Sequence, residues 1–220
     1  MVENDCWQKN LFVCGIDEAG RGCLAGPVVA AAVVLPAWTD YPLLIDSKQL
    51  TCKNRIQAFS WIKQHAFYAI GIAGVESIAK HNILNSTKMA MLQAFWQLWW
   101  QLNTQQSRLD HVLIDAVALA LPDNPRTKRP FAMSNPTNAE SLSASVAAAS
   151  IVAKVSRDTL LQQLDKLLPA YNFATNKGYG TSQHLSNLLS FGSSIIHRQQ
   201  FVTTALKNLE QKRAQRHHNV

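Results

Sequence analysis

Three acidic residues occupy places in the sequence where a strand is expected to end. Asp17 and Glu18 follow the apolar residues 11–16, and Asp115 follows residues 112–114. If the two strands are neighbours in a sheet, the three carboxylates meet at one edge, where like charges are unfavourable unless a cation is bound. Mg²⁺ takes oxygen ligands and keeps several waters, and two such ions about 3.5–4 Å apart can hold the attacking water and the leaving oxygen of a phosphodiester. The carboxylates therefore predict metal-dependent hydrolysis of a phosphodiester. The alternative for any one acid is a helix cap or a turn residue.

The elements that must position these acids are strands first and helices later in the chain. We predict strands at residues 11–16, 27–35, 67–75, 111–115 and 131–133, and helices at residues 51–65, 86–102, 141–167, 182–191 and 201–216. Small residues at 144–150 allow a helix to pack closely on a sheet. The order of elements favours an α/β sandwich, a mixed sheet flanked by helices, with a helical C-terminal extension.

Composition bounds the class of protein. With 220 residues, 47% of them hydrophobic, the chain can bury one sizeable core. Lysine and arginine outnumber the acids by 21 to 14, and the resulting net charge of +7 suggests a polyanionic partner, either nucleic acid or a membrane surface. Residues 1–5 are polar and do not resemble a signal peptide. The longest apolar run, residues 24–37, falls short of the roughly 20 residues that cross a bilayer as a helix.

The four cysteines indicate a reducing compartment. Cys6, Cys14, Cys23 and Cys52 form no Cys-x-x-Cys pair and have no histidine at metal spacing. Reduced thiols are the simpler interpretation, and a zinc site is disfavoured. We therefore expect a cytoplasmic protein without membrane attachment, and we expect it to be a monomer.

A set of motifs extends over most of the chain and resembles type 2 ribonuclease H (ribonuclease HII) closely. The motifs follow the order of that family, which makes the set far more specific than a lone glycine motif. They are Asp17-Glu18-Ala19-Gly20-Arg21-Gly22, residues 24–30 (LAGPVVA), Asp46-Ser47-Lys48, Leu113-Ile114-Asp115, residues 147–154 (AAASIVAK) with Arg157-Asp158, residues 177–181 (KGYGT), and His197-Arg198 with Phe201.

The resemblance implies a ribonuclease H-like fold and a site of four carboxylates that holds two divalent ions, Mg²⁺ or Mn²⁺. Asp17, Glu18 and Asp115 match three of the four by position. The fourth position is occupied by Glu140, where the family usually has aspartate, and Ala116 stands where the family usually has glycine. Asp158 is the rival for the fourth place.

If one helix runs unbroken through both candidates, Asp158 lies about 27 Å from Glu140 at about 1.5 Å per residue. Both cannot then serve one site. We favour Glu140 on position and interpret Asp158 as structural.

An enzyme that distinguishes RNA from DNA must sense the 2′-hydroxyl, which can donate and accept a hydrogen bond. Glycine lets the backbone approach a sugar closely, and arginine adds a partner for phosphate. The resemblance assigns ribose reading to Gly20, Arg21, Gly22 and Tyr179. Further candidates for contacts with phosphate are Lys48, Lys177 and Thr181.

Other conspicuous side chains have simpler interpretations. A Lys177-Gly178-Tyr179-Gly180 stretch taken alone is most often an ordinary turn. The aromatic residues from Phe95 to Trp100 have helical spacing and favour a packed core over base stacking. His184 and His197 are isolated and are interpreted as structural or capping residues.

The implied function is an endoribonuclease that hydrolyses the RNA strand of RNA–DNA hybrids and cuts 5′ of ribonucleotides, including single ones embedded in duplex DNA. Products would carry a 3′-hydroxyl and a 5′-phosphate. We expect a catalytic domain at residues 1–168 and a helical extension at residues 169–220 that contributes to substrate binding. The alternatives are a type 3 ribonuclease H and a nucleic-acid-binding module with weakened catalysis. The intact Gly-Arg-Gly turn argues against the first, and the three matching carboxylates argue against the second.

Overall fold

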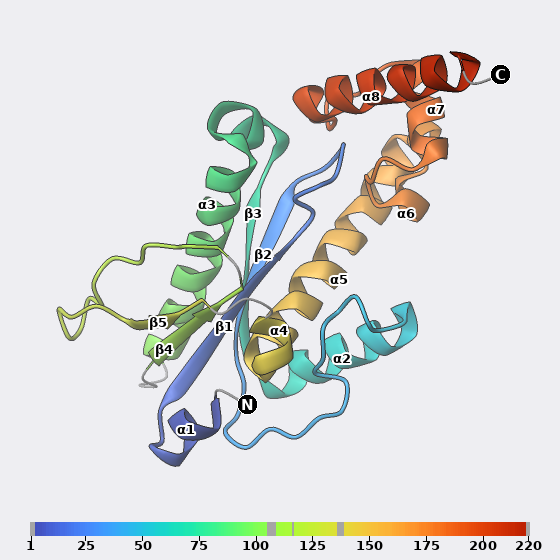
Figure 1. Cartoon of the computed structure of the whole chain (residues 1–220). Coiled ribbons are helices and arrows are strands. Elements are labelled where there is room, and N and C mark those ends of the chain that lie inside the picture. Colours follow the sequence, from blue (N-terminus) through green and yellow to red (C-terminus); the bar gives the residue numbers. More distant parts are fainter. Residues whose placement is uncertain (1–2, 105–108, 116, 136–138, 219–220) are drawn as a thin grey trace.

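A mixed five-stranded sheet forms the centre of the molecule (Figure 1). The computed structural model describes residues 3–104, 109–115, 117–135 and 139–218. The strand order is β3-β2-β1-β4-β5, in which β1 pairs antiparallel with β2 and parallel with β4. β2 and β3 are antiparallel, whereas β4 and β5 are parallel. The prediction of a mixed sheet is confirmed. The strands are β1 (Phe12–Ala19), β2 (Val28–Val34), β3 (Phe67–Ala73), β4 (Leu109–Ile114) and β5 (Ala132–Ser134).

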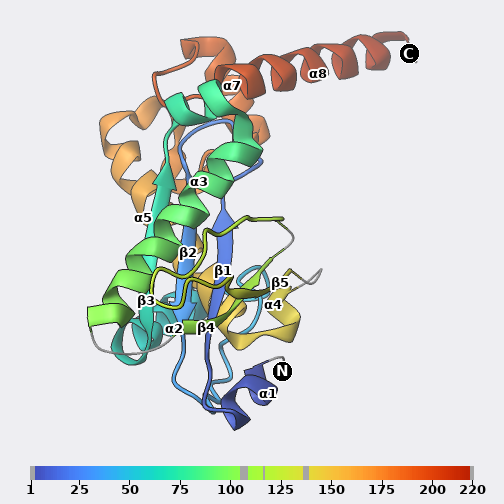
Figure 2. The same ribbon diagram turned by 90° about the vertical axis from the view of Figure 1, so that its left-hand side faces the viewer.

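Helices cover both faces of the sheet (Figures 1 and 2). Helix α3 (Val75–Thr104) packs on one face, while α2 (Cys52–His65) and α5 (Ala144–Leu167) pack on the other. Every residue of β2 is buried for this reason, as is typical of a central strand with two covered faces. A Cβ at Gly15 would collide with the backbone at Ser145, so the small residues predicted to allow close packing of α5 do so here.

Two helices differ from the prediction at their N-terminal ends. α3 begins at Val75, earlier than expected, and contains a kink at Asn82, whose φ is 63°. The Asn82 side chain accepts a hydrogen bond from the Asn85 amide at 3.0 Å and so caps the second segment of the helix. The expected continuous helix at 141–167 is wrong. Ser143 is extended and caps α5 by accepting from the Val146 amide at 3.1 Å, which separates α5 from the short helix α4 (Ala139–Leu142).

A short N-terminal helix, α1 (Glu3–Gln8), was not predicted. Its Glu3 side chain is fully buried and accepts hydrogen bonds from the Ser143 hydroxyl and, at 2.9 Å, from the Ser145 amide. This carboxylate therefore fixes the start of α5.

The C-terminal segment lies beyond the end of α5, and α8 projects away from the sheet (Figures 1 and 2). An apolar cluster joins the β1–β2 connection to this segment, with Leu24 and Ala25 packed among Leu161, Phe173 and Leu188. The segment consists of η1 (Pro169–Tyr171), α6 (Phe173–Asn176), α7 (Ser182–Phe191) and α8 (Gln199–His218).

Among the helices within the described ranges, none is long and apolar enough to cross a membrane.

Candidate active site

Two parallel neighbouring strands bring the acidic residues together. Asp17 and Glu18 lie inside β1, which continues to Ala19 by pairing with β2, so the predicted strand end at residue 16 is wrong. Asp115 directly follows β4. β1 and β4 are adjacent, with Ile16 opposite Ile114, and the Asp115 amide donates to the Ile16 carbonyl at 3.2 Å. Asp17 and Asp115 therefore occupy equivalent positions at one edge of the sheet. The two strands are neighbours, which is the condition under which the sequence predicts that the carboxylates meet.

A cleft of about 350 Å³ opens at this edge. It contains three of the four predicted carboxylates, the Gly20-Arg21-Gly22 turn, Lys48 and Tyr179. Among the residues that the structure describes, the lining consists of Asp17, Glu18, Ala19, Gly20, Arg21, Gly22, Ser47, Lys48, Arg55, Asp115, Ser150, Lys154 and Tyr179. These residues come from widely separated parts of the chain, so the fold assembles most of the predicted site.

Two predicted site residues, Lys177 and Thr181, lie outside this lining. The Lys177 carbonyl accepts from the Arg157 guanidinium at 2.8 Å, at the left-handed C-cap of α6. The Thr181 hydroxyl accepts from the His184 amide at 3.2 Å and so caps α7. Glu140 lies on α4, but its side chain is outside the described part of the structure, as is Ala116.

The carboxylates at the strand ends are electrostatically crowded. Burial, and then the charges of Glu18 and Asp115, raise the pKa of Asp17 well above its ordinary value. Burial also raises the pKa of Glu18, although Arg21, whose guanidinium lies 3.1 Å from a Glu18 carboxylate oxygen, opposes the shift. A bound cation would reverse both shifts, because it stabilises the ionised carboxylates.

The donor set fits a divalent cation that completes its coordination with water and phosphate. Glu18 Oε2 is buried and has no hydrogen-bond partner within the described residues, which leaves a carboxylate oxygen available to a cation. Among the residues that the structure describes, no group of three or more acidic, histidine or cysteine side chains is already arranged to hold a metal ion. Mg²⁺ does not require one, because it usually binds through one or two carboxylates together with waters and substrate phosphates.

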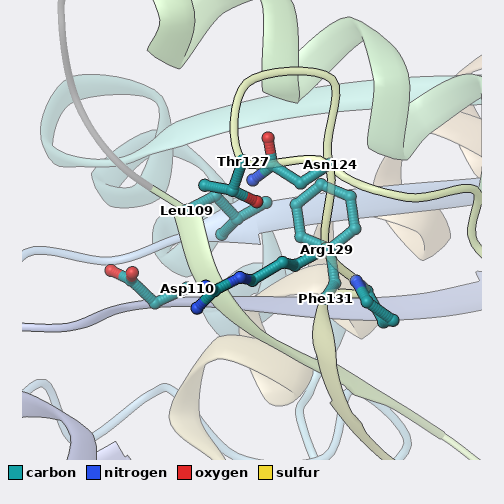
Figure 3. Close-up of a pocket in the computed structure, with 7 residues that line it drawn as sticks. Leu109, Asp110, Asn124, Thr127, Arg129 and Phe131 are labelled. Atoms are coloured by element: carbon teal, nitrogen blue, oxygen red, sulfur yellow. The ribbon is translucent and has the colours of Figure 1, made fainter.

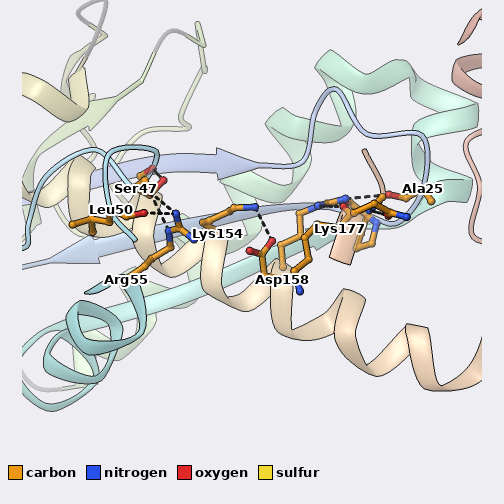
Figure 4. Close-up of polar contacts among 12 residues, drawn as sticks. Ala25, Ser47, Leu50, Arg55, Lys154, Asp158 and Lys177 are labelled. Carbon is orange, nitrogen blue, oxygen red and sulfur yellow. Dashed lines mark hydrogen bonds and ion pairs between the residues drawn. The ribbon is translucent and has the colours of Figure 1, made fainter. Parts of the chain in front are cut away.

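Two serines in the cleft support Asp17, and the sequence analysis gave them no role. Ser150 on α5 lies beside Asp17 in the cleft, where its hydroxyl lowers the pKa of the Asp17 carboxyl, and that hydroxyl lies 2.7 Å from the hydroxyl of Ser47. Arg55 on α2 donates twice to the Ser47 carbonyl, at 3.0 and 2.8 Å (Figure 4). Both serines lie within the family motifs. That position is the only feature of the sequence that indicates a role for them in the site.

A buried arginine lies between the Gly20 turn and the segment that precedes Tyr179. Arg157 on α5 is fully buried and donates to the carbonyls of Pro27 and Ala25, each at 3.0 Å, as well as to Lys177. A Cβ at Gly20, whose φ is +97°, would collide with this guanidinium. The close approach therefore requires glycine at position 20.

The Tyr179 ring lies over two cations from α5. Its centroid is 5.6 Å from Lys154 Nζ and 5.9 Å from Arg157 Cζ, within the range of cation–π attraction. Lys154 also pairs with Asp158 at 2.8 Å (Figure 4). Asp158 does not line the cleft, which agrees with its interpretation as a structural residue.

A second hollow of about 330 Å³ lies at the other end of β4 (Figure 3). It is lined by residues from β4 and the β4–β5 connection, including Asp110, Arg129 and Phe131. Asp110 accepts from the Phe12 amide at 3.2 Å and thereby joins the starts of β1 and β4. This hollow contains none of the predicted site residues.

Comparison with known proteins gives a consistent result. A family model described as Ribonuclease HII matches residues 14–204. The chain is 48% identical over 201 residues to a ribonuclease HII of Desulfitobacterium hafniense (strain DSM 10664 / DCB-2), which covers 90% of this chain and 72% of the relative. It is 42% identical over 207 residues to a ribonuclease HII of Caldanaerobacter subterraneus subsp. tengcongensis, which covers 93% of this chain and 80% of the relative.

Solved structures with a similar fold include ribonuclease H2 from Pyrococcus horikoshii OT3. The TM-score is 0.64 at 20% identity, with 91% of this chain and 99% of that chain covered. A structure of Bst-RNase HIII in complex with Mn²⁺ gives a TM-score of 0.66 at 18% identity, with 91% and 71% covered. These similarities show the fold, which is ribonuclease H-like.

Proposed function

Since this chain belongs to the ribonuclease HII family and is therefore a ribonuclease H endonuclease, we propose that it cuts RNA–DNA hybrids on the 5′ side of a ribonucleotide. The proposed substrates include DNA duplexes that carry a single ribonucleotide. The observation that supports this most is the position of Asp17, Glu18 and Asp115 in one cleft with the Gly20-Arg21-Gly22 turn and Tyr179.

Asp17, Glu18 and Asp115, together with Glu140, are the residues that would hold the divalent ions. Two such ions, Mg²⁺ or Mn²⁺, would supply an activated water and would neutralise charge on the phosphate and on the leaving 3′-oxygen. The Glu18 amide, which donates to the Asp17 carboxylate at 2.7 Å, orients it in the cleft, and the hydrogen-bonded hydroxyls of Ser150 and Ser47 lie beside it. Residues that orient ligands in this way commonly determine how well a metal site works.

The cations of the cleft bind the nucleic-acid backbone. Arg21 and Lys48 are exposed at the rim, where they can contact phosphates on either side of the cut. Lys177 and Thr181, next to Tyr179 in sequence, are proposed as more peripheral contacts with phosphate. Such contacts give affinity without sequence preference and weaken as salt rises.

Tyr179 and the glycine turn read the sugar. Tyr179 is 41% exposed at the cleft, and burial of part of its ring raises the pKa of the hydroxyl, which therefore stays protonated and can donate to a ribose oxygen. The backbone at Gly20 and Gly22 can approach the same sugar without a Cβ. We propose that residues 1–168 carry the carboxylates, while residues 169–220 supply Tyr179 and further substrate contacts.

The proposal is tested by mapping the cut in a DNA duplex that carries one ribonucleotide. We expect one incision, 5′ of the ribonucleotide, that leaves a 3′-hydroxyl on the DNA and a 5′-phosphate on the ribonucleotide. A cut on the 3′ side would contradict the proposal, as would cutting of RNA–DNA hybrids alone, which would favour the type 3 alternative. Binding without any cut, with Mg²⁺ or with Mn²⁺, would indicate the weakened binding module.

Replacing Tyr179 with phenylalanine should slow cleavage at a single embedded ribonucleotide about tenfold, the value of roughly one hydrogen bond of 1.4 kcal/mol. The matched control is Tyr68→Phe, because Tyr68 lies on β3 and packs edge-on against Phe59, away from the cleft. Single-turnover rates measure both. Equal rates for Tyr179→Phe and the wild type would count against a role for the hydroxyl.

Glu140→Ala should lose most activity, roughly ten- to a hundredfold, whereas Asp158→Asn should keep most of it. The difference follows because Glu140 matches the position of the fourth carboxylate in the sequence, while Asp158 forms an ion pair with Lys154 and does not itself line the cleft. The cleavage rates of the two variants, measured under the same conditions, decide whether Glu140 or Asp158 is the fourth carboxylate. The reverse pattern would make Asp158 the fourth ligand.

A further inference from the structure

Two buried imidazoles form a pair that the proposed reaction does not use. His184 on α7 and His197, in the connection between α7 and α8, are 0% and 4% exposed. Their Nε2 atoms lie 3.0 Å apart, so one nitrogen must donate to the other. The pair lies beside the Tyr179 segment, because His184 Nδ1 is 2.8 Å from the Tyr179 carbonyl.

The hydrogen-bond partners allow one proton arrangement. The Tyr179 carbonyl can only accept, so His184 Nδ1 carries a hydrogen. The Ser194 amide can only donate, and it lies 2.9 Å from His197 Nδ1, so that nitrogen carries none. Two neutral rings then satisfy every contact if His197 Nε2–H donates to His184 Nε2. Protonation of either ring would place two hydrogens face to face, at the His–His contact or at Ser194.

The surroundings keep both rings neutral. The groups that face them are the Tyr171 ring from η1, the Phe173 ring from α6 and Ser194. Burial lowers the pKa of both histidines, that of His197 to about 4 with a further contribution from the charge of His184.

The same segment also holds the other ribose-reading element. Arg198, next to His197, is buried and donates to the carbonyls of Arg21 at 2.8 Å and Gly26 at 2.9 Å. The Leu24 amide donates to the Gly178 carbonyl at 2.7 Å. The two loops that read the sugar are therefore tied to each other and to one C-terminal segment.

We propose that His184 and His197 are positioning residues. Through one neutral hydrogen-bonded arrangement they fix the backbone at Tyr179 and so hold its ring over Lys154 and Arg157, aimed into the cleft. The expected effect of the histidines on cleavage rests on the proposed role of Tyr179 in reading ribose. Their expected effect on the position of Tyr179 does not depend on that role.

The placement is tested without any substrate, by NMR of the full chain labelled in histidine and tyrosine. Imidazole ¹⁵N shifts should show hydrogen on Nδ1 of His184 and on Nε2 of His197. On lowering the pH, the Tyr179 signals should shift with the midpoint of His197. The chain has 4 tyrosines, and Tyr179→Phe identifies the signal. Tyr179 signals that stay unchanged while the histidines protonate would overturn the proposal.

The functional consequence is tested with His197→Phe, which keeps an aromatic ring but removes the donor, and His197→Gln, which restores a donor. We expect His197→Phe to lower the cleavage rate at a single ribonucleotide roughly ten- to a hundredfold, as misplacement of a substrate-contacting group does. His197→Gln should recover most of the rate. Equal rates for the two variants would overturn the proposal.

A double-mutant cycle separates positioning from a general effect on the fold. In a Tyr179→Ala background, His197→Phe should lower the rate no further, because the group that it positions is gone. If His197→Phe lowers the cleavage rate by the same factor in the Tyr179→Ala background as in the wild type, His197 acts on the fold alone. If Tyr179→Ala itself leaves the rate unaltered, the proposed role of Tyr179 fails, and the NMR titration still decides whether the histidine pair places it.

Discussion

Asp17→Asn should lower the rate of cleavage on the order of a thousandfold, because charge stabilisation by a metal site is worth several kcal/mol in the transition state. Asp17 is the most buried of the cleft carboxylates that the structure describes, and the Glu18 amide orients it by donating to its carboxylate at 2.7 Å. The amide is the same size but carries no charge for a cation. Affinity for the duplex should stay the same or rise, since the substitution removes a negative charge from a cleft that takes phosphate.

The matched control for this prediction is Asp110→Asn. Asp110 lies on β4, in the hollow at the opposite end of that strand, and an asparagine there can still accept from the Phe12 amide. Single-turnover rates and duplex affinities are measured for both variants. A loss of less than tenfold in Asp17→Asn would remove Asp17 from the proposed metal site.

Arg157→Met should destabilise the protein by at least about 3 kcal/mol, because it leaves buried carbonyls without their donor. Three backbone carbonyls, of Ala25, Pro27 and Lys177, converge on this one guanidinium. Methionine has a comparable apolar chain but cannot donate. The loops that carry Gly20 and Tyr179 should separate, so cleavage should fall as well.

Lys166→Met is the control for Arg157→Met, because it removes a positive charge from an exposed position in the last turn of the same helix. Its free energy of unfolding should stay within about 0.5 kcal/mol of the wild type. Urea unfolding measures both variants. If Arg157→Met unfolds at the wild-type midpoint, Arg157 does not hold these loops together.

The arrangement of the carboxylates could be predicted from the sequence because it depends on local patterns. Apolar runs that lead to Asp17 and to Asp115 already locate the two strands that carry the acids, although β1 continues past Asp17 to Ala19. Only the adjacency of the strands had to be assumed, and the pairing of β1 with β4 confirms it. The family motifs contain the other residues of the cleft lining, with the exception of Arg55.

Other features could not be predicted, since they depend on contacts between distant parts of the chain. The break at Ser143 interrupts a sequence with helical character, and the partner that stabilises it is Glu3, on a helix too short to identify from its own residues. Arg157 looks like an ordinary helical arginine until the chain brings the carbonyls of Ala25 and Pro27 to it.

The histidine pair was recognised only as structural or capping residues for the same reason. His184 and His197 are thirteen positions apart, and their joint proton arrangement appears only when Tyr179 and Ser194 are placed around them. Sequence spacing contains no signal for such a chain of hydrogen bonds.

The central claim is that the carboxylates at the ends of β1 and β4 form a divalent-metal site, and Mn²⁺ binding tests it most directly. Electron paramagnetic resonance measures free Mn²⁺ during titration of the wild type, Asp17→Asn and Asp110→Asn. We predict that the wild type and Asp110→Asn bind Mn²⁺ alike, that Mg²⁺ competes, and that Asp17→Asn binds much more weakly. Equal binding by all three proteins would contradict the claim and would place the metal elsewhere.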